Sequence, residues 1–280
     1  MHDHPVPEYR VLFTVDIEDY SSRNDAEQRT LQSALSQMLD DAADAAELDR
    51  QAWERQHGGD GVYAILPAGT NVTPLMDTFV RELDAALGSY NRRRHETTWS
   101  RLRLRMAVHI GPVHLNGAMG WPGQHAVQPA RLRDSEPLRA AMGALSEADL
   151  GVIVSSEIYR DYITQGPGEP RPTLFRPVRV EMKRQSYVAY LYVPRFNLHI
   201  VEALAAYSPS SGTEGGDPPP ADKPPGSTLP FPGSGGGGDS NAGAMGGGGH
   251  TNIAYGAGDA FTGDKVGGNK NTYHGDHHDG

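Results

Sequence analysis

Cysteine is absent from the 280-residue chain, which excludes a disulfide framework, thiolate metal sites and a cysteine nucleophile. No stretch approaches the roughly 18 consecutive apolar residues of a membrane-spanning helix, and the polar opening MHDHPVPEYR lacks the apolar core of a signal peptide. Basic side chains are also few, 25 Lys and Arg against 35 Asp and Glu, so a general nucleic-acid-binding face is not expected. We therefore expect a cytoplasmic protein with neither nucleic acid nor a membrane as a partner.

The composition changes sharply near the C-terminal end of the chain. From Ser208 onward the sequence is rich in Pro, then in Gly, and it ends in a Gly/Asp/Asn/His tail. Such a segment buries too little apolar surface to offset the cost of ordering its backbone, about 1–2 kcal/mol per residue. We predict a flexible N-terminus at residues 1–7, a folded domain over 8–195, an extension of open assignment over 196–207, and a disordered linker and tail over 208–280.

The hydrophobic periodicity of the folded part predicts alternating strands and helices. Strands are expected over residues 9–17, 62–69, 101–117 and 150–155 and twice within 176–194, and helices over 25–56, 72–91, 129–142 and 156–163, with Pro129 in the first turn of the third. A βαββαβ order with an appended αββ indicates an α+β fold, a ferredoxin-like sandwich with helices on a mostly antiparallel sheet.

Two aspartates stand where strands end or begin. Asp16 closes the apolar run Val11–Val15, and Asp60 lies in the turn GGDG just before the next strand. If these strands are neighbours, both carboxylates project from one end of the sheet, where without a nearby Lys or Arg each would raise the pKa of the other. A divalent cation removes that penalty, and Mg²⁺ prefers one or two carboxylates plus substrate phosphates. The simpler alternatives are a helix cap for Asp16 and an ordinary Asp-Gly turn for Asp60.

Four stretches in this order, FTVDIEDYSSR, GGDGVYAIL, MAVHIGPVH and RLRDSEPLRAAM, resemble the class III nucleotidyl cyclase catalytic domain, in the divergent form of high-GC (actinobacterial) bacteria. The resemblance covers about residues 8–195. It implies a head-to-tail homodimer whose shared sites bind a nucleoside triphosphate. Two Mg²⁺ or Mn²⁺ ions would be held by Asp16, Asp60 and the carbonyl of Ile17, and the ribose 3′-hydroxyl would attack the α-phosphorus.

The opposite half of the implied site departs from the family pattern. Arg131 matches the arginine that stabilises charge on the transferred phosphate, but the residue four positions earlier is Val127 instead of Asn. Gln128 takes that role if the chain is displaced by one residue, because positions i and i+3 share a helix face.

The positions implied to read the base also differ from the family. They are Gln56, where the family has Lys, and Gly120, so the resemblance names no particular base. Lys183 matches a phosphate-contacting lysine, with surface charge as the alternative. Glu18 and Asp19 are expected to be solvated loop charges.

The tail over residues 252–280 resembles short Gly/Asn-rich motifs at the ends of bacterial signalling proteins, some of which stack as β-arches. It would then engage a protein partner; the alternative is a disordered, solubilising end.

Two hypotheses for the whole chain follow. It is a metal-dependent nucleotidyl cyclase, or it is a non-catalytic cyclase-homology module that dimerises, senses nucleotide and presents the tail.

Overall fold

The computed structural model describes residues 6–93, 101–115, 117, 120–166, 168–182 and 185–209. Residues 1–5, the segment 94–100 and the tail from 210 lie outside this set, and so do the predictions made for them. Within it, seven strands form one sheet in the order β2-β3-β1-β4-β5-β7-β6. The strands are β1 (Glu8–Ile17), β2 (Glu54–His57), β3 (Gly61–Ile65), β4 (Leu104–Val113), β5 (Leu150–Ser155), β6 (Arg176–Met182) and β7 (Gln185–Tyr192).

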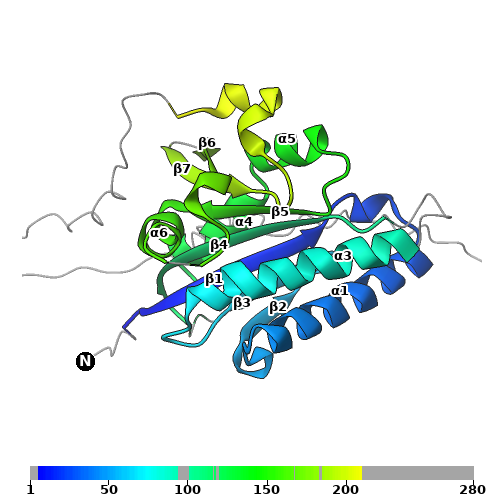
Figure 1. The fold of residues 1–280 in the computed structure, drawn as a ribbon. Helices are drawn as coiled ribbons and strands as arrows, with labels where there is room; N and C mark the ends of the chain where they lie inside the picture. The colour runs from blue at the N-terminus through cyan, green and yellow to red at the C-terminus, as the bar shows by residue number, and fades with distance from the viewer. Residues whose placement is uncertain are drawn as a thin grey trace, which may run out of the picture. The chain divides into compact units, whose positions relative to one another are not determined.

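Helices cover both faces of this sheet (Figure 1). They are α1 (Asp25–Ala45), α2 (Val72–Pro74), α3 (Val80–Arg93), α4 (Gln124–Arg133), α5 (Glu136–Ala144) and α6 (Ser156–Ile158), with π-helical turns over Leu75–Phe79 and Tyr159–Ile163. The first part of the chain runs β1, α1, β2, β3, α3, β4, and all pairings except β4–β5 are antiparallel. The predicted ferredoxin-like α+β fold is therefore confirmed.

Strand β1 separates two layers of the core. Val11, Phe13 and Val15 belong to the large cluster with α1 and α3, whereas Leu12 belongs to a smaller cluster that includes Ala126 of α4. Because side chains alternate along a strand, Asp16 faces the same side as Leu12. The predicted strand end thus points its carboxylate toward α4.

The helix predicted over residues 25–56 is shorter than expected. It ends at Ala45, and Glu47 adopts a left-handed backbone with φ of 54°. The chain then turns back because Arg50 donates to the carbonyl of Ser36 and Trp53 packs edge-on against Phe13, with ring centroids 5.3 Å apart. No Gly or Pro signals this reversal, so periodicity alone could not locate it.

The prediction for Pro129 is also wrong. Helix α4 starts at Gln124, after Gly123 with a φ of 117°, so Pro129 lies in the helix interior. Proline has no N–H and leaves the carbonyl of His125 without its helical donor. The helix breaks after Arg133, and α5 begins with a different proline, Pro137, in its first turn.

The chain after β7 packs against the hydrophobic core beneath α5. Leu198, Val201 and Leu204 are buried in the cluster that contains Leu138 of α5. Residues 198–207, left open by the sequence, therefore pack onto the domain in two short 3₁₀ helices. Among the helices described, none is long and apolar enough to cross a bilayer.

Candidate functional site

The two predicted aspartates lie on neighbouring segments. Asp16 pairs with Gly61 across β1 and β3, and the N–H of Ile17 donates to the carbonyl of Asp60 at 2.8 Å. The pairing needs a glycine, since a Cβ on Gly61 would lie 2.0 Å from the carbonyl oxygen of Val15. The short turn GGDG thereby brings Asp60 beside the end of β1, as its place before a strand suggested.

Two arginines contact Asp16, which the sequence argument did not foresee. Oδ2 of Asp16 accepts from Nη2 of Arg105 at 2.7 Å, and Nε of Arg133 lies 3.5 Å away. Arg105 is directly opposite Asp16 on β4, so the pairing of β1 with β4 could have revealed it. Arg133 comes from the last turn of α4, and no local pattern places it there. The condition stated for repulsion between the two carboxylates, the absence of a nearby Lys or Arg, is therefore not met at Asp16.

These arginines do not fully compensate the buried charge. Burial raises the pKa of Asp16 to about 6, although Arg105 and Arg133 act to lower it, and the charge of Asp60 adds to the rise. Oδ1 of Asp16 is buried and has no hydrogen-bond partner within the described residues. A buried, unpartnered carboxylate oxygen is costly, and a cation beside it would offset that cost.

The residues at this edge fit a divalent cation held partly by a ligand. No group of three or more His, Asp or Glu that could hold a metal occurs among the described residues. The protein oxygens here are the carboxylates of Asp16 and Asp60 and the backbone of Ile17, which faces the Asp60 turn. Mg²⁺ and Mn²⁺ accept such a small set when phosphate or water completes the coordination.

Arg131 does not join Asp16 within one chain. It is exposed on α4, and it stands two residues before Arg133, which places it about 200° around the helix. Val127 and Gln128 are half-exposed on the same helix. Of the two arginines on α4, Arg133 therefore reaches Asp16 of the same chain, and Arg131 faces outward.

The two positions implied to read a base lie side by side. A Cβ on Gly120, whose φ is 113°, would lie 3.1 Å from Nε2 of Gln56. Gln56 pairs with Tyr63 across β2 and β3, and the ring of Trp121 lies over Tyr63 with centroids 5.3 Å apart. Gln56, Gly120 and two aromatic rings therefore share one region. Lys183, the remaining predicted contact, lies outside the described residues.

Glu18 is not the solvated charge that the sequence suggested. Its carboxylate pairs with Nη1 of Arg103 at 2.8 Å, and the side chain is 20% exposed. Arg103 also donates to the carbonyls of Met142 and Leu145 at the end of α5. The segment that follows Asp16 is thereby tied to α5. Asp19, in contrast, is exposed as expected.

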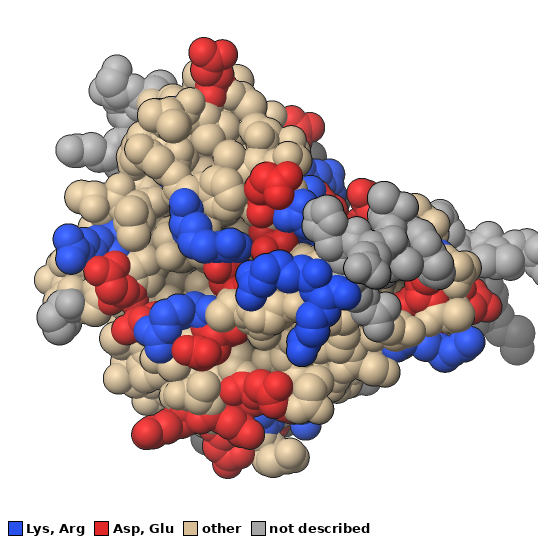
Figure 2. All heavy atoms as spheres, turned by 45° about the vertical axis from the view of Figure 1, so that its right-hand side comes forward, with Lys and Arg blue, Asp and Glu red and all other residues tan. Residues whose placement is uncertain are grey.

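Charges of both signs crowd this end of the sheet. The tip of β1 lies at the right of Figure 1, and Figure 2 turns that side forward, where basic and acidic side chains are intermingled. Such a mixed face lacks the continuous positive surface that binds nucleic acid, but it can bind an anion and a cation side by side.

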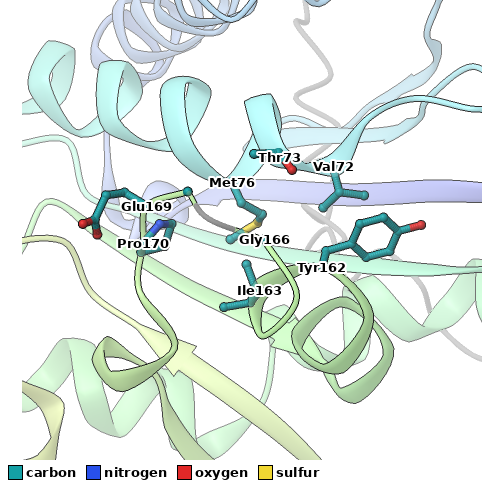
Figure 3. A pocket seen from close by; sticks show the side chains of 9 residues that line it. Val72, Thr73, Met76, Tyr162, Ile163, Gly166, Glu169 and Pro170 are labelled. Atoms are coloured by element: carbon teal, nitrogen blue, oxygen red, sulfur yellow. The ribbon is translucent and has the colours of Figure 1, made fainter.

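A second hollow has different chemistry. Figure 3 shows it between the helical segments 72–79 and 156–163, with Met76, Ile163 and Tyr162 on its walls and the Glu169 carboxylate turned outward. Among the described residues that line it, Glu169 brings the one carboxylate, and that carboxylate points away from the hollow. The edge around Asp16 is the better candidate site.

A pair of histidines, the buried His109 and the half-buried His125, connects β4 to the start of α4. Nε2 of His109 and Nδ1 of His125 are 2.8 Å apart, their rings are stacked, and a Cβ on Gly111 would lie 2.1 Å from His125. Burial, and then the charge of His125, lowers the pKa of His109 to about 3. Burial also lowers the pKa of His125, against the opposing charge of Glu157.

This pair makes stability depend on pH. The unfolded chain binds a proton on His109 near pH 6.5 and the folded protein does not, so this contribution to stability is full above pH 6.5 and falls as the pH drops. We expect a loss of about 1.4 kcal/mol per pH unit for each such proton. Denaturant unfolding at pH 7 and 5 should show a larger loss in wild type than in His109→Gln, with the exposed His57→Gln as the control. Asp16 titrates in both wild type and His109→Gln, so its contribution cancels when the two losses of stability are subtracted. Equal losses in wild type and His109→Gln would contradict the assignment of the pH dependence to the histidine pair.

Comparison with known proteins concerns the fold. No protein-family model matches the chain, and no curated protein sequence does. Among solved structures, the guanylyl cyclase Cya2 is similar, with 14% identity, 68% of this chain and 94% of that chain covered, and a TM-score of 0.47. The adenylyl cyclase CyaB from P. aeruginosa is 16% identical, the match covers 68% of this chain and 97% of that chain, and the TM-score is 0.44. The adenylate/guanylate cyclase/hydrolase from Silicibacter pomeroyi is 17% identical, the match covers 68% of this chain and 98% of that chain, and the TM-score is 0.46. Such identities carry no activity across to this chain.

Proposed function

We propose that this chain is a divergent class III nucleotidyl cyclase, which binds a nucleoside triphosphate with two Mg²⁺ or Mn²⁺ ions and cyclises it within a homodimer. One observation carries the proposal: among the residues that the structure describes, none hydrogen-bonds the buried Oδ1 of Asp16, which lies beside the turn that bears Asp60. A buried carboxylate oxygen without a hydrogen bond costs stability even though Arg105 and Arg133 pair with the other oxygen of Asp16, and a cation-dependent function explains that cost.

Each residue has a defined part in this proposal. Asp16, Asp60 and the backbone of Ile17 would hold the ions, whose chemistry is to neutralise the triphosphate and lower the pKa of the 3′-hydroxyl. The 3′-hydroxyl would release its proton to solvent as its oxygen forms a bond to the α-phosphorus and the bond to the leaving pyrophosphate breaks. Arg131 of a second copy would stabilise the charge that develops on the transferred phosphate, with Gln128 beside it.

The base and phosphate contacts complete the proposed site. The carboxamide of Gln56 can both donate and accept, so it does not restrict the base to one purine. Lys183 would contact a phosphate. The chain would act in the cytoplasm, with the tail presented to a protein partner.

A non-catalytic module that dimerises and senses nucleotide is the second candidate. It is favoured by Val127, which cannot supply the hydrogen bonds of the Asn expected there, and by Arg105, which already pairs with Asp16. Loss of one preorganised donor lowers a rate by roughly 10²–10³. The two candidates therefore differ in turnover and share nucleotide binding.

One assay separates them. Purified protein is incubated with each of the four nucleoside triphosphates and Mn²⁺, and cyclic products are sought by mass spectrometry. A cyclic nucleotide from at least one substrate supports the cyclase. Binding of nucleotide without any cyclic product supports the second candidate, and neither binding nor product rejects both.

Cation binding should also be visible in thermal stability. At about 100 times its dissociation constant, Mn²⁺ should stabilise the fold by about 2.7 kcal/mol and raise Tm by roughly 5–10 °C. The cation competes with a proton on Asp16, whose pKa is raised to about 6, so the rise should be full above pH 7 and lost toward pH 5. Scanning calorimetry with and without Mn²⁺ measures it, and Asp16→Asn should show no rise at either pH. A rise that is the same at both pH values would place the cation elsewhere.

A further inference from the structure

A single glutamine ties together the two segments that carry the aspartates. Nε2 of Gln32, on α1, donates to the hydroxyl of Tyr20 at 2.7 Å and to the carbonyl of Gly59 at 2.6 Å. Tyr20 lies in the 3₁₀ turn that follows Asp16, and Gly59 directly precedes Asp60. Both hydrogens of one carboxamide are therefore used to bridge two loops that are distant in sequence.

The Asp60 turn needs such a tie. Three of the four residues in Gly58–Gly61 are glycine, and glycine loses the most backbone entropy on ordering. The turn is closed by its own bond from Gly58 to Gly61, and it is joined to β1 through the N–H of Ile17. Gln32 adds the bond that holds it against α1.

Tyr20 lies near the Asp60 turn, since a Cβ on Gly59 would be 3.8 Å from its ring. Burial raises the pKa of Tyr20, the charge of Asp60 raises it further, and the hydrogen bond from Gln32 acts to lower it. The phenol hence stays neutral at physiological pH and adds no charge to the site. It serves as a fixed hydrogen-bonding point to which Gln32 attaches the other loop.

The tie borders a space that a ligand can enter. Gln32, His57, Asp60 and Ser36 line a cleft of about 440 Å³ between α1 and the β2–β3 hairpin. The cleft reaches Asp60 from the α1 face of the sheet, whereas the Asp16 carboxylate points toward α4 on the other face. Any movement of the turn would change the distance between the two carboxylates.

We propose that Gln32 is a positioning residue, which sets the placement of Asp60 relative to Asp16 and thereby the affinity for a divalent cation. The cation-binding role rests on the proposed function. The carboxamide does not contact the cation; it acts through Tyr20 and Gly59.

The test compares Gln32→Ala with Gln28→Ala in the full chain. Gln28 lies one turn earlier on α1 and donates to the carbonyls of Arg23 and Tyr20, but it does not reach the Asp60 turn. Mn²⁺ affinity is measured from the free-ion paramagnetic resonance signal, and amide hydrogen exchange is measured over residues 57–61. We expect Gln32→Ala to weaken Mn²⁺ binding about five- to tenfold and to speed exchange in the turn, with Tm close to wild type. Gln28→Ala should change neither.

The conservative variant Tyr20→Phe removes one of the two bonds and should give an intermediate affinity. Unchanged Mn²⁺ affinity in Gln32→Ala, with a wild type that binds Mn²⁺, overturns the positioning role whatever the exchange rates are. A wild type that binds no Mn²⁺ overturns the proposed metal site itself. Faster amide hydrogen exchange in Gln32→Ala would then mean that Gln32 only stabilises the turn, without any role in cation binding.

Discussion

Asp16→Asn should abolish cyclic-nucleotide formation, with a fall of at least about 10³-fold, because loss of one preorganised group already costs about 10²–10³. The substitution keeps the shape of the side chain but removes the charge that would hold the cation. The measurement is the initial rate with Mn²⁺ and the preferred nucleotide, quantified by mass spectrometry.

Asp19→Asn is the matched control. It makes the same chemical change three residues away, on an exposed side chain with a left-handed backbone that Asn tolerates. Asp60→Asn should give the same loss as Asp16→Asn at a half-exposed position, where folding is less at risk. A fully active Asp16→Asn protein, or an equal loss in Asp19→Asn, would contradict the assigned site.

Mixing two inactive proteins should restore activity. If each site combines Asp16 of one subunit with Arg131 of the other, Asp16→Asn and Arg131→Ala proteins are both inactive alone. A 1:1 mixture contains about half heterodimers, each with one intact site, so about a quarter of wild-type activity should return. The assay is the rate of the mixture after subunit exchange, compared with each protein alone.

Arg133 should behave differently from Arg131 in the same experiment. If Arg133→Ala lowers the activity of the pure protein, the defect lies in the site of its own chain, because Arg133 contacts Asp16 of that chain. Mixed with Asp16→Asn, it then leaves a defect in both sites of the heterodimer. That mixture should stay inactive, whereas Arg133→Ala mixed with Arg131→Ala should regain activity. Recovery with Asp16→Asn would mean that Arg133 works across the interface instead.

Much of the fold could be predicted from local patterns. The apolar run Val11–Val15 predicts a buried strand, and the spacing of the helices and strands predicts the ferredoxin-like order, because alternation and periodicity reflect burial within each element. The end of α1 could not be predicted. It depends on Trp53 packing against Phe13 and on Arg50 bonding to Ser36, contacts between residues that no local pattern relates.

By itself, the sequence determined that two aspartates stand at a strand end and at a glycine-rich turn, because strand length and turn composition are local properties. Only the tertiary structure decided the charge balance around them. Arg105 reaches Asp16 through strand pairing, and Arg133 reaches it through the rotation of α4 on the sheet. The same rotation turns Arg131 outward. Electrostatic energy depends on distances through space, and a helix of fixed sequence can present either arginine until its packing against the sheet selects one.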